Sequence, residues 1–453
     1  MPKVKTLYVC QSCGVQFPKW QGKCTSCNAW NTLVEERVSR KSTKSLSGAN
    51  GTKAKAIHIS EVATSPVPRI LTADEELNRT LGGGIVPGSV ILLGGEPGIG
   101  KSTLLLQMVL QLNDVKCAYI SGEESAEQVK MRANRISSDS TSNIYILTNT
   151  SVRDIIKELD SLEPQIVVID SVQTLISDEL ESAPGSVSQV RESTHILQEW
   201  AKQKNIPIIL VGHITKEGSL AGPKVLEHMV DTVLQFEGDQ RHQYRILRSL
   251  KNRFGATSEL GIYEMNAQGL RPVTNPSEIL IQDKEQWSSG IAIGATVEGQ
   301  RVMLIECQAL VTTSVFGTPQ RSVTGYDLRR MNMLLAILEK RFGFAYSNKD
   351  VFLNMAGGLK IDDPAMDLAI IAALISSYED KVISENICFA GEVGLAGEIR
   401  AVSRVDQRIA EGNKLGFKSI ILSKFNKMNV NKSELEIKLG LISRVNDLSK
   451  IIV

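Results

Sequence analysis

Residues 95–103, G-E-P-G-I-G-K-S-T, have the residue types and spacing that bind a nucleoside triphosphate. They fit the pattern G-x4-G-K-[ST], in which glycines let backbone N–H groups surround a phosphate. We expect Lys101 to reach the β- and γ-phosphates and Ser102 to ligate Mg2+. The apolar run SVILLGG before the loop and the helical pattern KSTLLLQMVLQL after it provide the strand and the helix that such a loop requires. The expected nucleotide contacts are Gly94, Gly95, Glu96, Pro97, Gly98, Ile99, Gly100, Lys101, Ser102 and Thr103.

Polar side chains follow three other apolar runs, where parallel strands would end beside this loop. QIVVID ends at Asp170, the expected second contact to Mg2+, with a strand-end cap as the alternative. KCAYIS is followed by Glu123 and Glu124, and hydrolysis needs a base that activates water at the γ-phosphate. Either glutamate can be that base, or both are acidic residues at the start of a helix. His213 ends IPIILVGH and either senses the γ-phosphate or makes a strand-end hydrogen bond.

Four of the seven cysteines stand close together near the N-terminus, in the spacing C-x2-C, ten residues, C-x2-C. Two such knuckles complete a tetrahedral sulfur cage for structural Zn2+, whereas a thioredoxin-like redox site would need a βαβ context that is missing. The expected ligands are Cys10, Cys13, Cys24 and Cys27. Trp20 and Trp30 are expected to pack on the knuckles, with stacking on nucleic acid as the alternative. The remaining cysteines are expected core residues: Cys117, Cys307 and Cys388.

The overall composition is that of an ordinary globular protein. The chain has 453 residues, of which 42% are hydrophobic and 22% charged, and a formal net charge of +1. A nucleic acid would therefore be held by local basic patches and not by a global positive field. No apolar run reaches the roughly 18 residues of a spanning helix, and the N-terminus has no signal-peptide core, so we expect a cytoplasmic protein without a membrane partner.

Composition divides the chain into four parts. Residues 1–30 hold the four cysteines, and 31–59 are expected to be a flexible basic linker. In 60–272, apolar runs alternate with helical patterns, which predicts an α/β domain whose parallel sheet is covered on both faces. Residues 273–453 have an α+β pattern: a strand pair that turns at 298–300, followed by two helical segments.

The order of these parts, with LGGGIVPGS before the phosphate loop and K-N-R-F-G at 251–255, resembles the bacterial RadA/Sms DNA-repair family over essentially the whole chain. Many families share the phosphate loop, whereas the KNRFG string together with the cysteine knuckles is specific. The resemblance implies a RecA-like core that hydrolyses ATP, a C-terminal domain similar to that of Lon protease, and a homo-hexameric ring. It also implies branch migration on single-stranded and branched DNA during strand exchange by the RecA recombinase.

The resemblance assigns roles to single residues. Walker A is matched by Gly95, Gly100, Lys101, Ser102 and Thr103. Asp170 matches Walker B, and Glu123 matches the catalytic glutamate better than Glu124 because it follows its strand at the same offset. Lys251 and Arg253 match the family motif. Two apart on an extended segment, they would point the same way and reach a neighbouring subunit's γ-phosphate, like an arginine finger, with surface charges near a turn as the alternative.

Two polar loops after strand ends, 176–192 and 215–224, are candidates for DNA contact, because RecA-like proteins place their DNA loops there. Lys216 and Lys224 would hold phosphates, with ordinary surface loops as the alternative.

The C-terminal part departs from Lon protease at its chemistry. The serine nucleophile position is Ala365, and the lysine partner falls at about Asp406, so a Ser–Lys dyad cannot form. We expect a proteolytically inactive scaffold that assembles the ring. Its arginines are candidates for DNA contact, with plain helix-surface charges as the alternative: Arg321, Arg329, Arg330 and Arg341.

These residues favour a DNA-dependent ATPase that performs helicase-like branch migration on recombination intermediates. One alternative is an ATP-switch scaffold without motor activity, which failure of single-stranded DNA to stimulate hydrolysis would favour. The other is an ATP-dependent protease, which the missing dyad opposes.

Overall fold

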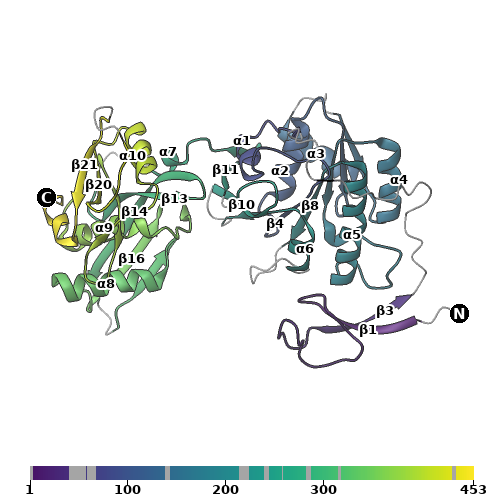
Figure 1. Ribbon diagram of the computed structural model, residues 1–453, viewed down its shortest axis with the longest axis horizontal. Coiled ribbons are helices and arrows are strands. Elements are labelled where there is room, and N and C mark those ends of the chain that lie inside the picture. Colours follow the sequence, from purple (N-terminus) through teal and green to yellow (C-terminus); the bar gives the residue numbers. More distant parts are fainter. Residues whose placement is uncertain are drawn as a thin grey trace. The chain divides into compact units, whose positions relative to one another are not determined.

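The computed structural model describes residues 4–39, 58, 68–137, 143–213, 224–238, 244–257, 259–281, 287–314, 318–430 and 435–452. The chain divides into two compact units, one of residues 1–240 with 245–272 and one of 241–244 with 273–453. In Figure 1 the first unit runs from purple to teal and the second from green to yellow.

The N-terminal segment is a small three-stranded ribbon. Its strands are β1 (Val4–Cys10), β2 (Gln16–Phe17) and β3 (Leu33–Ser39), in the order β2-β1-β3. β1 and β3 are antiparallel from the pair Val4–Ser39 to the pair Cys10–Leu33. The expected linker start at residue 31 is therefore wrong, because β3 lies inside the range 31–59. Its charged residues, Glu35, Glu36 and Arg37, resemble a linker in composition, but they lie on a strand that is paired with β1. Of the rest of that range, residues 40–57 and 59 lie outside the described residues.

The centre of the first unit is a nine-stranded sheet in the order β12-β11-β10-β9-β4-β8-β7-β5-β6. Its strands are β4 (Val90–Gly95), β5 (Cys117–Ser121), β6 (Ile144–Leu147), β7 (Ile166–Asp170), β8 (Ile208–His213), β9 (Thr232–Glu237), β10 (Tyr244–Asn252), β11 (Leu260–Asn266) and β12 (Gly269–Pro272). Strands β9, β4, β8, β7, β5 and β6 are parallel, and β10 pairs antiparallel with β9.

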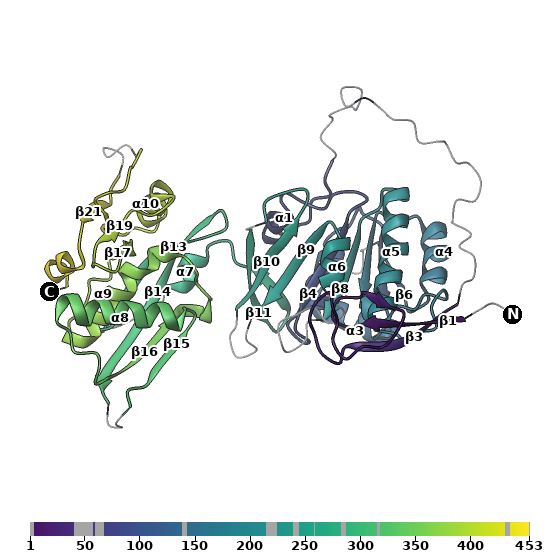
Figure 2. The ribbon, with the colours of Figure 1, turned by 60° about the horizontal axis from the view of Figure 1, so that its bottom comes forward.

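Helices cover both faces of this sheet, and Figure 2 shows α4 (Val152–Leu162) and α5 (Val187–Lys204) side by side on one of them. The helices are α1 (Glu75–Thr80), α2 (Lys101–Leu110), α3 (Ala126–Ile136), α4 (Val152–Leu162), α5 (Val187–Lys204) and α6 (Lys224–Met229). Along β4, Ile91 and Leu93 belong to the core under α2 and α3, while Val90 and Leu92 belong to the core under α4 and α5. Both faces are buried, which is why these strands are apolar without alternation.

The second unit contains a seven-stranded mixed sheet in the order β15-β16-β14-β13-β17-β20-β21 and a small pair, β18-β19. Its strands are β13 (Ile291–Glu298), β14 (Arg301–Thr313), β15 (Arg321–Thr324), β16 (Lys349–Met355), β17 (Ile387–Ala390), β18 (Glu392–Val393), β19 (Ile399–Arg400), β20 (Ser419–Ser423) and β21 (Lys438–Ile442). Its helices are α7 (Pro276–Leu280), α8 (Leu328–Phe342), α9 (Asp367–Glu379) and α10 (Val405–Lys414). The predicted strand pair and helical segments are confirmed as β13–β14, α8 and α9.

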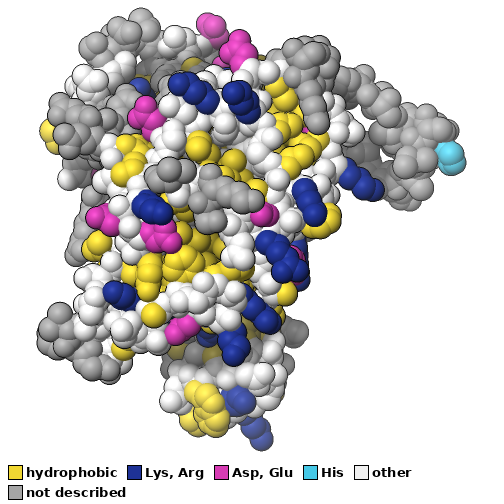
Figure 3. Space-filling view, turned by 90° about the vertical axis from the view of Figure 1, so that its left-hand side faces the viewer, with side chains coloured by type: hydrophobic (Ala, Val, Ile, Leu, Met, Phe, Trp, Pro, Cys, Tyr) yellow, Lys and Arg dark blue, Asp and Glu magenta, His cyan; other side chains and the backbone are white. Residues whose placement is uncertain are grey.

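The surface of the second unit carries scattered apolar and basic side chains, which Figure 3 shows on one face. α9 is the central helix, since Asp367 through Ser376 are all buried. Among the described helices, none combines the length and the apolar character needed to cross a membrane.

Candidate nucleotide and metal sites

The phosphate loop joins β4 to α2 and depends on glycine at two positions. Gly98 and Gly100 have φ of 76° and 115°, in the left-handed region that favours glycine. A Cβ on Gly100 would also lie 2.8 Å from Cε of Met265. Ile99 between them is 1% exposed and anchors the loop in the core. The loop therefore presents its backbone at the N-terminus of α2, the geometry that binds anions.

Lys101 is the buried cation of this loop. Its side chain donates hydrogen bonds to the carbonyl oxygens of Gly95, at 2.7 Å, and Glu96, at 2.9 Å. Burial lowers the pKa of Lys101 to about 8, although the carboxylates of Asp170, Glu123 and Glu96 favour the charged form. A bound triphosphate would add charge of the same sign as these carboxylates and hold the amine protonated.

Three of the predicted polar residues meet at one edge of the sheet. Gly95 at the end of β4 is in register with His213 at the end of β8, and β7 ends beside β8 at Asp170. His213 Nε2 lies 3.4 Å from Oε1 of Glu123, and Ser171 Oγ donates a hydrogen bond of 2.7 Å to the same oxygen. Among the described residues, Nδ1 of His213 is buried without a partner.

Glu123 and Glu124 have different surroundings. The carboxylate of Glu124 forms an ion pair with Arg132 of α3, and its backbone N–H and C=O both bind the hydroxyl of Ser121. The side chain of Glu123 is 51% exposed and is the one that contacts the nucleotide-side groups. Glu123 is therefore the one whose carboxylate lies among the polar groups at this end of the sheet, whereas Glu124 belongs to the contacts of α3.

Tyr119 is a site residue that the sequence reasoning missed. It is fully buried in β5, and its hydroxyl donates a hydrogen bond of 2.8 Å to Oδ2 of Asp170. Burial and the charge of Asp170 raise the pKa of Tyr119 well above its ordinary value, which keeps the hydroxyl a donor. The available signal was a tyrosine inside the buried run CAYIS, because a buried tyrosine hydroxyl needs a partner.

The ammonium of Lys251 binds the end of α6 in its own chain. Its Nζ donates to the carbonyl oxygens of Glu227 at 2.7 Å, His228 at 3.3 Å and Val230 at 2.8 Å. Burial lowers the pKa of Lys251, and the charge of Arg253 acts in the same direction. Lys251 therefore terminates a helix and is not a free cation on the surface.

Arg253 lies at the opposite end of the sheet from the phosphate loop. Its side chain is 52% exposed and contacts Oδ1 of Asp231 at 3.1 Å. The other carboxylate oxygen of Asp231 accepts from the backbone N–H of Val90, at the start of β4. Because β4 runs from Val90 to Gly95, about 17 Å of strand separates Arg253 from its own loop. Arg253 is therefore far from the phosphate loop of its own chain, as we predicted for a residue that acts on a neighbouring subunit.

The KNRFG segment also packs against the LGGG segment. A Cβ on Gly255 would lie 2.8 Å from Cα of Gly82. Arg69 joins the two segments, since its guanidinium donates to the carbonyl oxygens of Gly82 at 2.6 Å and Phe254 at 2.7 Å. The two sequence signatures therefore form one structure, although about 170 positions separate them.

The two candidate DNA loops are described unequally. In 176–192, the buried amide of Gln189 holds the loop through the backbone of Ser177, Leu180 and Ser182. In 215–224, Lys216 and the side chain of Lys224 lie outside the described residues.

The four knuckle cysteines form one cluster, with their Sγ atoms all within 4.8 Å of one another. Cys10 and Cys27 are 3.7 Å apart and Cys13 and Cys24 are 3.5 Å apart, too far for disulfides. A tetrahedral Zn–S cage with bonds of about 2.3 Å has sulfur–sulfur edges of about 3.8 Å, so the arrangement fits Zn2+. Trp20 and Trp30, which we expected to pack on the knuckles, are 58% and 70% exposed, so neither ring is part of a buried core.

In the second unit, the position that corresponds to the Lon nucleophile holds a residue without a nucleophilic group. Ala365 is fully buried in the core. Asp363 beside it accepts from Arg408, also fully buried, at 2.7 Å. Asp406, at the expected lysine position, accepts from the backbone of Asn429.

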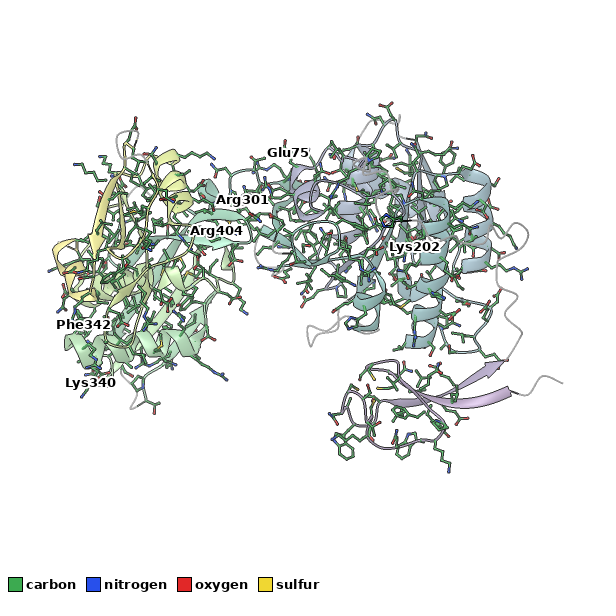
Figure 4. All side chains as sticks on the ribbon, in the orientation of Figure 1. Glu75, Lys202, Arg301, Lys340, Phe342 and Arg404 are labelled. Carbon is green, nitrogen blue, oxygen red and sulfur yellow. The ribbon has the colours of Figure 1, made fainter. Side chains whose placement is uncertain are left out.

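Two of the candidate DNA-binding arginines have partners inside this unit. Arg330 binds both carboxylate oxygens of buried Asp367, at 2.7 and 2.6 Å, and Tyr326 donates to the same carboxylate. Arg321 donates to the carbonyl of Tyr346 at 3.2 Å. Arg330 therefore stabilises the core helix α9. A third candidate, Arg341, is exposed in the last turn of α8, between Lys340 and Phe342, which are labelled in Figure 4.

The fold and the first site define a P-loop ATPase that carries a four-cysteine zinc ribbon. Comparisons with known proteins agree: residues 58–219 match the AAA domain family, 8–35 the rubredoxin metal binding domain, and 305–426 subunit ChlI of Mg-chelatase. The chain is 49% identical over 431 residues to DNA repair protein RadA of Bacillus subtilis (strain 168), covering 94% of both chains. It is also 49% identical to that of Listeria monocytogenes, over 433 residues that cover 95% of this chain and 94% of the relative. The chain belongs to the DNA repair protein RadA family.

A solved structure of the RadB recombinase has 22% identity and a TM-score of 0.36, with 45% of this chain and 99% of that chain covered.

Proposed function

We propose that this chain is a DNA-dependent ATPase that processes recombination intermediates by branch migration in RecA-mediated strand exchange. One observation carries the proposal: the phosphate loop, the end of β7 and Glu123 meet at one sheet edge, while Arg253 is held at the other end of the same sheet. The site has the groups that bind ATP, but the arginine that would stabilise the transferred phosphate lies far from it in the same chain. This arrangement suits ATP hydrolysis between neighbouring subunits of a ring.

In this mechanism Lys101 neutralises the β- and γ-phosphates, and backbone N–H groups at the start of α2 surround them. Ser102 and Asp170 offer the oxygen ligands that Mg2+ prefers, and the ion would neutralise the charge that develops on the phosphates. Glu123 orients the attacking water and accepts its proton. Ser171 and His213 position the carboxylate of Glu123, because both contact its Oε1 atom.

Assembly would supply the missing cation. In a homo-hexameric ring, Arg253 of one subunit would reach the γ-phosphate of the next, and Lys251 would hold the segment that carries it. The second unit would act as a proteolytically inactive scaffold, since Ala365 offers no nucleophile. Single-stranded and branched DNA, the RecA recombinase and a cytoplasmic location are parts of the same proposal, supported by the family.

The decisive experiment measures ATP turnover with and without single-stranded DNA, beside strand displacement on a three-strand intermediate. We expect DNA to stimulate turnover and ATP to drive displacement. Glu123→Gln is the matched control, since it should bind DNA and ATP but displace nothing. Turnover that DNA does not change would contradict the motor and favour an ATP-switch scaffold.

A further inference from the structure

The zinc ribbon exposes two tryptophans that its own fold does not use. Trp20 is 58% and Trp30 70% exposed, whereas Trp200 in α5 is 5% exposed and donates to Asp160. The buried hydrophobic residues among those described in the ribbon are instead Val9, Leu33 and two of the cysteines. Single exposed apolar residues are normal, but exposed apolar side chains that lie together mark interaction sites. The two rings therefore need an explanation outside the stability of the ribbon.

Both rings lie close to one glycine. A Cβ on Gly22 would be 3.8 Å from the six-membered ring of Trp20 and 3.9 Å from that of Trp30. Lys23 pairs with Trp30 across an antiparallel bridge, and its ammonium lies 5.6 Å from the centre of the Trp30 ring. Trp20, Gly22, Lys23 and Trp30 form one surface, which we call the tryptophan platform.

The charges around the platform do not oppose the approach of a polyanion. Residues 7–34 contain Lys19 and Lys23 and no aspartate or glutamate. Four thiolates and one Zn2+ would sum to a charge of about −2, which the two lysines offset. The platform would thus neither repel phosphates nor attract them strongly, and stacking on the rings would be the main attraction. Exposed aromatic rings beside lysine, with no acidic side chain, are the composition of single-strand binding surfaces.

We propose that the tryptophan platform stacks the bases of single-stranded DNA. Bases present flat faces to any aromatic ring, so this contact would be independent of sequence. None of its residues belongs to the phosphate loop or to the candidate DNA loops at 176–192 and 215–224. The inference rests on the proposed function only in taking DNA as the ligand.

The test compares the full-length protein with Trp20→Ala/Trp30→Ala, without nucleotide, using a labelled oligo(dT). Oligo(dT) should quench tryptophan emission of the unaltered protein, and the double variant should bind about ten- to a hundredfold more weakly. The loss should be nearly the same at about 50 and about 200 mM salt, because stacking releases few counterions. Tyr145→Ala is the matched control, since Tyr145 is 46% exposed with Lys116 at 5.6 Å from its ring; it should bind normally.

Two further measurements separate a lost contact from a lost fold. The double variant must retain zinc, and Trp20→Phe/Trp30→Phe should restore most of the affinity because rings remain to stack. A zinc-loaded double alanine variant that binds oligo(dT) as well as the unaltered protein would overturn the proposal, and would leave a protein partner as the occupant of the platform. If the unaltered protein binds no single-stranded DNA, the proposed function itself fails.

Discussion

Glu123 and Glu124 are neighbours in the chain, but their carboxylates have different partners. Because Glu123 contacts Ser171 and His213, Glu123→Gln should slow hydrolysis by about a hundredfold or more while ATP still binds. Glu124→Gln removes only the partner of Arg132 and should slow it far less. Phosphate release in single turnovers, beside nucleotide binding, measures both. A slower Glu124 variant would reverse the assignment.

Tyr119 should act as a positioning residue for Asp170. Tyr119→Phe keeps the buried ring but removes the hydrogen bond to the Asp170 carboxylate. We expect the Mg2+ concentration for half-maximal turnover to rise about tenfold, with turnover at saturating Mg2+ nearly unchanged. Tyr145→Phe on neighbouring β6 is the control. An unchanged Mg2+ dependence, measured by titration, would show that Asp170 needs no support from this hydroxyl.

The lowered pKa of Lys101 predicts a pH dependence of ATP binding. The free protein loses the lysine proton above pH about 8, whereas phosphates hold it, so ATP binding takes up a proton at higher pH. Affinity should fall about tenfold between pH 7 and pH 9. Calorimetry at pH 8.5 in two buffers of different ionisation enthalpy measures the proton. Lys101→Arg stays charged and should show no uptake; equal uptake in that variant would assign the proton to another group.

At the scale of elements, zinc should stabilise the ribbon but not the nine-stranded sheet. Cys10→Ala leaves three ligands and should remove the metal, and the ribbon should unfold because its few buried residues cannot hold it. The nine-stranded sheet has its own cores and should keep its cooperative thermal transition. Zinc content and calorimetry test this, with Cys117→Ala in β5 as the control that keeps zinc. A folded ribbon without metal would contradict the structural role.

What the sequence predicts depends on how local the determinant is. The phosphate loop and the cysteine knuckles are contiguous, so spacing alone fixes their geometry. The contacts of Tyr119 with Asp170 and of Arg330 with Asp367 join distant positions, and no local pattern marks them. β3 was missed for a related reason: its charges are those of a linker, and only its pairing with β1 makes it a strand. Sequence reasoning therefore predicted the loops that bind and missed the contacts that hold them.

At the scale of the whole molecule, Arg253 should act on a neighbouring subunit. Lys101→Ala removes the loop cation and Arg253→Ala removes the finger, so each variant alone should be inactive. In mixed rings about a quarter of the interfaces would combine an intact loop with an intact finger, and turnover should partly return. Turnover along a titration at fixed total protein, with mixed rings confirmed by mass, tests this. Mixtures that stay inactive would place Arg253 at its own nucleotide.

The three carbonyls that surround Lys251 make the two basic positions of K-N-R-F-G chemically unequal. An ammonium directs its three N–H bonds as a pyramid, and the oxygens of Glu227, His228 and Val230 receive them. A guanidinium holds its donors in one plane, and a pair of parallel N–H bonds matches two oxygens of a carboxylate or phosphate. Position 251 thus requires a compact donor group that binds three carbonyls at one helix end. Position 253 requires a planar donor group that faces outward. Exchanging the two residues would conserve charge, composition and spacing, yet place each cation in a setting shaped for the other.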